Sequence, residues 1–180
     1  MLGLTVDKKK YMIGLISRLT DQKGLDLIDF VIERIIDDYT QLVVIGTGEE
    51  RYENMFRYFA WKHGDKISAN ICYNDDLAHK LYAAADAFLM PSAFEPCGLT
   101  QLISFRYGTV PIVRETGGLK DTVQAYNEYE HTGDGFSFAN YNGEEMLSVI
   151  NYSKKVFYED KKNWNKIIDR GMAKDFSWKN

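Results

Sequence analysis

The stretch Phe94–Gln101 has the sequence FEPCGLTQ and comes three residues after the apolar segment 85–90, which we predict to be a buried strand. An acidic residue, Glu95, therefore stands between a strand and the glycine-bearing start of a helix. In an open α/β sheet, ligand sites are built in this way at the carboxyl edge of the strands. The start of such a helix also points free backbone N–H groups at a bound anion. We therefore expect an anion-binding corner at Phe94–Gln101.

Short apolar runs and helical patterns alternate along the rest of the chain. Because each predicted strand is apolar on both faces, the strands should form a parallel sheet covered by helices on both sides. This predicts an α/β, doubly wound, Rossmann-like domain over residues 11–180, preceded by a linker remnant at 1–10. Strands are expected at 12–16, 41–45, 67–72, 87–90, 110–113 and 136–138, and helices at 25–36, 50–62, 75–84, 99–107, 143–158 and 160–170.

The composition of the chain argues against several classes of partner, namely nucleic acid, membranes and metal ions. The 180 residues carry a net charge of −4, which argues against nucleic acid as a partner. No apolar run is long enough to span a bilayer, so we expect no membrane partner. Cys72 and Cys97 form neither a disulfide framework nor a metal-binding spacing, and the three histidines show no ligand spacing. These features predict a cytoplasmic protein without a metal site.

Polar or glycine-bearing clusters follow the predicted strands at 17–24, 46–48, 91–100 and 114–121. Each could be an ordinary turn, but the carboxyl ends of parallel strands share one edge, so the clusters can converge. Arg18 and Lys23 lie in the first cluster, where a rigid guanidinium and a mobile ammonium suit a diphosphate. Solvated surface cations are the alternative, although cations at a helix N-terminus oppose the helix dipole.

In the cluster at 91–100, the Glu95 carboxylate is expected to accept hydrogen bonds from sugar hydroxyls, and the N–H groups of Gly98, Leu99 and Thr100 to face phosphate. A carboxylate that merely favours the helix dipole is the alternative for Glu95. Cys97 has no nearby base to activate it, so we expect a small packing residue whose backbone lines the site, rather than a nucleophile.

Two further positions complete the expected site. Gly46 begins Gly-Thr-Gly, which lacks the third glycine of the dinucleotide fingerprint, so a dehydrogenase is disfavoured. The P-loop pattern is also absent from the sequence. Tyr73 follows the third predicted strand and could stack on a base, or could be an ordinary aromatic at the rim.

Three long motifs, RLTDQKGLD at 18–26, EPCGLTQ at 95–101 and TGGLKDTV at 116–123, resemble those of bacterial and plant glycogen and starch synthases. The DFSW sequence of Asp175–Trp178 is similar too. The resemblance implies the carboxyl-terminal, nucleotide-sugar-binding half of a retaining glycosyltransferase with two Rossmann-like domains. It also implies that the amino-terminal half, which holds the glucan acceptor, and the final cross-over helix lie outside this chain.

The resemblance further implies transfer of glucose from ADP-glucose to the non-reducing end of an α-1,4-glucan, with ADP as product and no cofactor or metal. It implies that Arg18, Lys23 and Glu95 are catalytic residues. It also implies that the donor is bound by these three residues and by Gly46, Tyr73, Cys97, Gly98, Leu99 and Thr100. A stand-alone nucleotide- or sugar-phosphate-binding module and another retaining transferase, such as sucrose synthase, remain as alternatives.

Overall fold

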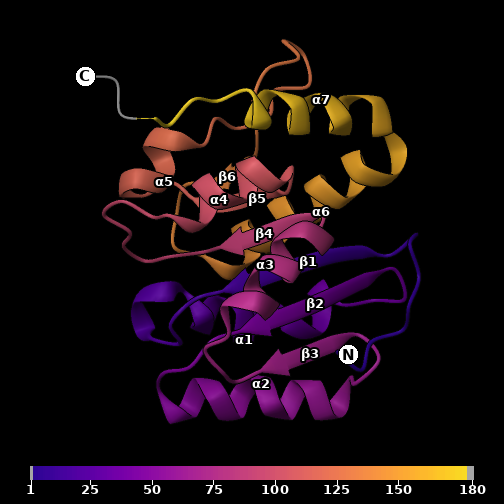
Figure 1. Cartoon of the computed structure of the whole chain (residues 1–180), viewed down its shortest axis with the longest axis vertical. Helices are drawn as coiled ribbons and strands as arrows, with labels where there is room; N and C mark the ends of the chain where they lie inside the picture. The colour runs from indigo at the N-terminus through magenta and orange to yellow at the C-terminus, as the bar shows by residue number, and fades with distance from the viewer. Residues whose placement is uncertain (1, 178–180) are drawn as a thin grey trace.

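The computed structural model describes residues 2–177, so Trp178 of the DFSW motif lies outside the described residues. Within them, a six-stranded sheet has the order β3-β2-β1-β4-β5-β6, and every neighbouring pair is parallel (Figure 1). This confirms the predicted doubly wound, Rossmann-like sheet. The strands are β1 Tyr11–Ile16, β2 Thr40–Ile45, β3 Ile67–Asn70, β4 Ala87–Met90, β5 Val110–Arg114 and β6 Phe136–Phe138.

Helices cover both faces of the sheet, as the two-sided apolar strands require. Side chains of α1, α2, α6 and α7 form one buried cluster with residues such as Ile13 and Leu42. Side chains of α3, α4 and α5 form a second cluster with Val43 and Phe88 from the opposite face. The helices are α1 Leu25–Ile35, α2 Glu50–Lys62, α3 Asp75–Ala84, α4 Thr100–Tyr107, α5 Gly117–Thr122, α6 Gly143–Glu159 and α7 Lys161–Met172.

The strand order reverses between β1 and β4. From β1 the chain moves outward through β2 to β3, then crosses to β4 and moves the other way to β6. In an open parallel sheet, the crevice at such a switch point is where ligands bind. The loops that leave β1 and β4 at this point are residues 17–24 and 91–99, and they contain Arg18, Lys23 and Glu95.

Local signals set most element boundaries. Asn74 caps α3, since its side chain accepts a hydrogen bond from the Leu77 N–H at 3.0 Å. The third strand ends at Asn70 rather than at Cys72, because the Cys72 N–H already turns back to the Asn70 carbonyl. Neither α5 nor the short 3-10 helix at Asp21–Lys23 was predicted.

Residues 2–10 form no helix or strand. Leu2 and Leu4 nevertheless pack against the cluster on the α3 face, and Gln41 Nε2 donates to the Thr5 carbonyl at 2.7 Å. The segment thus follows the amino edge of the sheet, on the opposite side from the loops at the switch point. Its role as a linker stays a prediction.

Candidate functional site

The loops after β1 and β4 are joined by direct backbone contacts. The Ala93 N–H donates to the Gln22 carbonyl at 2.9 Å. At Gly24, which has a φ of 74°, an added Cβ would lie 2.0 Å from the Pro91 carbonyl oxygen. Only a glycine allows both this left-handed conformation and this close approach. The glycine therefore brings the two loops together and places their side chains in one site.

Lys23 and Glu95, which are far apart in the sequence, form an ion pair in this site. The Nζ–Oε2 distance is 2.6 Å, and the two side chains are 18% and 17% exposed. Sequence reasoning treated Lys23 as a cation awaiting an anion and Glu95 as an acceptor awaiting a sugar. The structure gives each a protein partner. Because an ammonium group has three donors, Lys23 can keep Glu95 and still reach an anion.

Arg18 differs from Lys23. Its side chain is exposed, and no ion pair or hydrogen bond joins its guanidinium to another residue between positions 2 and 177. A guanidinium keeps its charge at any ordinary pH and offers a bidentate fork for phosphate oxygens. At the switch point, Arg18 is therefore the cation that is free to bind an anionic ligand.

The loop before α4 is held in place by the glycines of α5. The Gly118 N–H donates to the Glu95 carbonyl at 3.0 Å, and an added Cβ on Gly118 would lie 1.9 Å from the Cys97 carbonyl oxygen. Helix propensity did not reveal α5, because two consecutive glycines disfavour a helix. The buried Leu119 side chain anchors it to the sheet instead. The TGGL motif thus acts as a backbone support for Glu95.

The amino end of α4 offers free donors beside this ion pair. Helix α4 begins at Thr100, and its N-cap residue Leu99 has no capping side chain. Within residues 2–177, the backbone N–H groups of Gly98 and Leu99 donate to no other residue. Unsatisfied N–H groups at a helix N-terminus are a ready-made anion site. The expectation that phosphate faces the N–H groups of Gly98, Leu99 and Thr100 stays a prediction.

Two adjoining cavities open at the switch point. The smaller, of about 100 Å³, is lined by Lys23, Glu95 and Gly98 among others. The larger, of about 530 Å³, is lined by Arg18, Gly46 and Tyr73 among others. Four residues line both cavities, namely Ile16, Ser17, Leu99 and Thr100. The structure thus brings together eight of the nine positions expected to bind the donor, and Cys97 is the exception.

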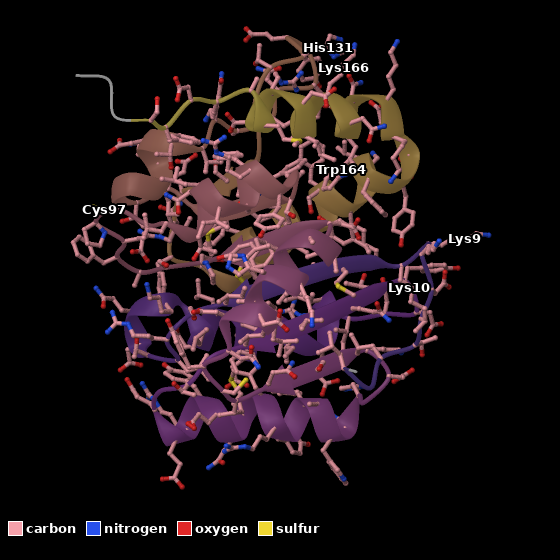
Figure 2. The ribbon with its side chains drawn as sticks, viewed as in Figure 1. Lys9, Lys10, Cys97, His131, Trp164 and Lys166 are labelled. Carbon is pink, nitrogen blue, oxygen red and sulfur yellow. The ribbon has the colours of Figure 1, made fainter. Side chains whose placement is uncertain are left out.

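Cys97 was expected to be a small packing residue, and this is wrong. Its side chain is exposed and lines neither cavity, and Figure 2 places it at the periphery of the molecule. The reason is that the Cys97 backbone faces inward. Its carbonyl accepts a hydrogen bond from Gln101 Nε2 at 3.1 Å and is approached closely by Gly118, so the side chain is turned to solvent.

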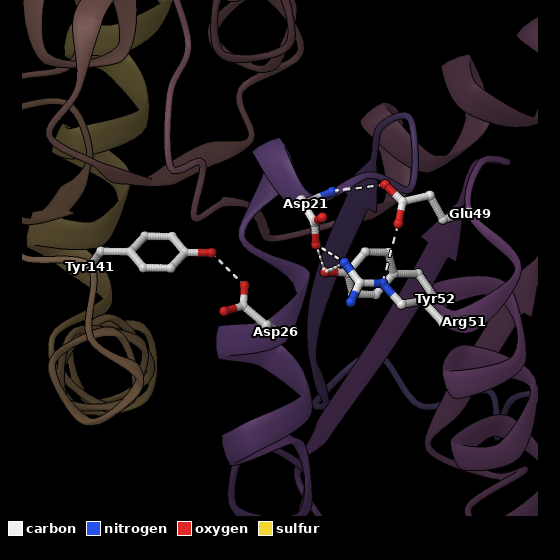
Figure 3. A network of polar contacts seen from close by, with 6 residues as sticks. All are labelled: Asp21, Asp26, Glu49, Arg51, Tyr52 and Tyr141. Carbon is white, nitrogen blue, oxygen red and sulfur yellow. Dashed lines mark hydrogen bonds and ion pairs between the residues drawn. The ribbon is translucent and has the colours of Figure 1, made fainter.

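A second set of polar contacts links the loop after β1 to the start of α2 (Figure 3). Arg51 forms ion pairs with Asp21 and Glu49, and the Tyr52 hydroxyl donates to the Asp21 carboxylate. Burial raises the pKa of the Tyr52 phenol, so Tyr52 remains a neutral donor at physiological pH. These contacts tie the 3-10 helix that ends at Lys23 to the start of α2. The sequence analysis missed the contacts with Asp21 because Arg51 and Tyr52 lie about 30 residues away from it.

Across residues 2–177, no group of three or more His, Cys, Asp or Glu side chains is arranged to hold a metal ion. None of the helices in the same range is long and apolar enough to cross a membrane. At the switch point, the side chains of Arg18 and Lys23 are cationic, and the backbone N–H groups of Gly98 and Leu99, which are free within this range, precede α4.

Comparison with known proteins identifies the family. The model of the family described as glycosyl transferases group 1 matches residues 3–169. A glycogen synthase from Lachnospira eligens is 68% identical over 177 residues, which are 98% of this chain and 37% of that protein. A glycogen synthase from Lachnoclostridium phytofermentans is 63% identical over 178 residues, or 99% of this chain and again 37% of the relative.

A solved structure agrees with these relatives. The catalytic domain of starch synthase IV from Arabidopsis thaliana, bound to ADP and acarbose, superposes with a TM-score of 0.90 at 33% identity. The match covers 98% of this chain and 37% of that one, so the chain spans little more than a third of the proteins it matches. The resemblance to glycogen and starch synthases is confirmed. The chain belongs to the glycosyl transferases group 1 family.

Proposed function

We propose that the chain is the donor-binding half of a glycogen synthase, which transfers glucose from ADP-glucose to the non-reducing end of an α-1,4-glucan with retention of configuration. The observation that carries the proposal is the convergence of Arg18, the Lys23–Glu95 pair and the free N–H groups before α4 at two adjoining cavities. The glycogen synthases and the ADP-bound starch synthase support the choice of donor.

In this proposal, the nucleoside occupies the larger cavity, with its base near Tyr73. The diphosphate lies between Arg18, Lys23 and the amino end of α4. The glucose reaches the smaller cavity, where the Glu95 carboxylate accepts hydrogen bonds from its hydroxyls.

The chemistry required of these groups is stabilisation of charge. When the glycosidic bond to the donor breaks, negative charge grows on the departing diphosphate. Preorganised cations and N–H groups at that position favour the transition state more than the ground state. Arg18 supplies a positive charge there, Lys23 an ammonium shared with Glu95, and α4 its dipole. Contacts with the glucan acceptor are assigned to a part of the glycogen synthase outside this chain.

The first test is titration of the chain with ADP by calorimetry. We expect saturable binding, and we expect Arg18→Ala to weaken it about tenfold, because one charge-assisted contact with phosphate is lost. Since Arg18 is exposed, the thermal stability of the chain should not change.

Arg57→Ala is the matched control for this titration. Arg57 is an exposed arginine on α2 that pairs with Glu53, and it lines neither cavity. Its removal should leave ADP binding unchanged. Absence of saturable binding up to millimolar ADP, with the protein folded, would refute donor binding by this chain.

A further inference from the structure

Arg114, at the end of β5, contacts the loop that carries Glu95. Its Nη1 donates to the carbonyl oxygens of Ser92 at 3.3 Å and Ala93 at 2.9 Å. These residues lie three and two positions before Glu95. A single guanidinium thus bridges the end of one strand to the loop that leaves its neighbour in the sheet.

The surroundings of Arg114 fix the direction of its guanidinium. Its Cζ lies 5.5 Å from the centre of the Tyr141 ring, and the Tyr141 hydroxyl donates to Asp26 on α1. The Nε of Arg114 is buried and has no hydrogen-bond partner within residues 2–177. A buried donor without a partner is costly. Arg114 therefore keeps its hydrogen bonds to the Ser92 and Ala93 carbonyls while its buried Nε donor remains without a partner among the described residues.

The Ser92–Ala93 segment is held from its other side as well. The Ala93 N–H donates to the Gln22 carbonyl, next to Lys23. Ser92 is buried, and its hydroxyl lies 3.5 Å from Glu95 Oε2. A shift of this segment would move the Glu95 carboxylate away from Lys23 and from the smaller cavity.

We propose that Arg114 is a positioning residue that fixes the Glu95 carboxylate for the glucose of the donor. Arg114 lines neither cavity, so it acts through the Ser92 and Ala93 carbonyls rather than by touching the donor. The inference rests on the proposed function, because it assigns to Arg114 the orientation of the group that contacts the sugar.

The test compares the affinities of the chain for ADP and for ADP-glucose. With Arg114→Met, we expect ADP affinity to stay within about twofold and ADP-glucose affinity to fall about tenfold, because only the sugar contact depends on Glu95. Arg114→Lys should recover part of the loss, since an ammonium can donate to one carbonyl but lacks the planar fork. If Arg114 had only a structural role, its substitution would lower the affinities for ADP and for ADP-glucose by similar factors.

A double-mutant cycle with Glu95→Gln separates the possible outcomes. If Arg114 acts through Glu95, the losses in ADP-glucose affinity should not add, whereas additive losses would overturn the inference. If Arg114→Met does not fold, the cycle is run with Arg114→Lys. If the parent chain fails to bind ADP-glucose, the proposed function fails. If the parent binds it and the Arg114 variants bind both ligands like the parent, only the role of Arg114 is refuted.

Discussion

Gly118→Ala is expected to disable the site while most of the fold remains. The added Cβ would lie 1.9 Å from the Cys97 carbonyl oxygen and 2.5 Å from its carbon, and both atoms belong to the backbone. The loop before α4 must therefore move away, and the hydrogen bond from the Gly118 N–H to the Glu95 carbonyl is lost. A displacement of about 1 Å in a segment that positions reacting groups can lower the rate of a reaction on the order of 100-fold. We expect a loss of that size in ADP-glucose affinity.

The same substitution should lower the free energy of unfolding by about 1–3 kcal/mol, as overpacking of a tight contact does. Gly64→Ala is the matched control, because Gly64 lies in the exposed turn after α2 and its added Cβ would lie 3.3 Å from one atom, the Ala60 carbonyl oxygen. That change should stay within about 0.5 kcal/mol. Calorimetry and thermal unfolding measure both effects. Parent-like donor affinity in folded Gly118→Ala would contradict the role given to the TGGL motif.

Lys23→Met is expected to have the second-largest effect. It removes a cation from the diphosphate position and also leaves the half-buried Glu95 carboxylate without its 2.6 Å partner. Loss of one member of a buried charge pair commonly costs about 2 kcal/mol or more. ADP affinity should therefore fall by roughly 30-fold in calorimetry.

The double variant Lys23→Met/Glu95→Gln separates these two contributions. Neutralising Glu95 should restore part of the affinity for ADP, because the unpaired carboxylate no longer repels the phosphates. Lys166→Met is the control, since Lys166 is an exposed lysine on α7, far from Cys97 in Figure 2. ADP affinity that is the same in Lys23→Met as in the parent would remove Lys23 from the donor site.

The sheet could be predicted from the sequence because its strands are short apolar runs buried on both faces. The strand expected at 87–90 is β4, although the segment first predicted as a strand begins at Ala85. Helix α5 could not be found in this way, because its first two residues are glycines and its stability comes from packing of Leu119. Local propensity is a weak signal wherever tertiary contacts dominate.

For the candidate site, the sequence predicted which residues would converge but not which partners they would contact. Arg18, Lys23 and Glu95 follow predicted strands, so their shared edge could be expected. The ion pair between Lys23 and Glu95 spans 72 positions and has no local signature. Arg114 was treated as part of a polar cluster, because nothing in the sequence shows that its guanidinium reaches across to Ser92 and Ala93.

The most direct test of the central claim is a crystal structure of the chain with ADP-glucose. We predict the base in the larger cavity near Tyr73 and the diphosphate between Arg18, Lys23 and the amino end of α4. The glucose should lie beside Glu95. A nucleotide bound elsewhere, or one whose phosphates contact neither Arg18 nor Lys23, would contradict the assignment of this switch point as a sugar-nucleotide site.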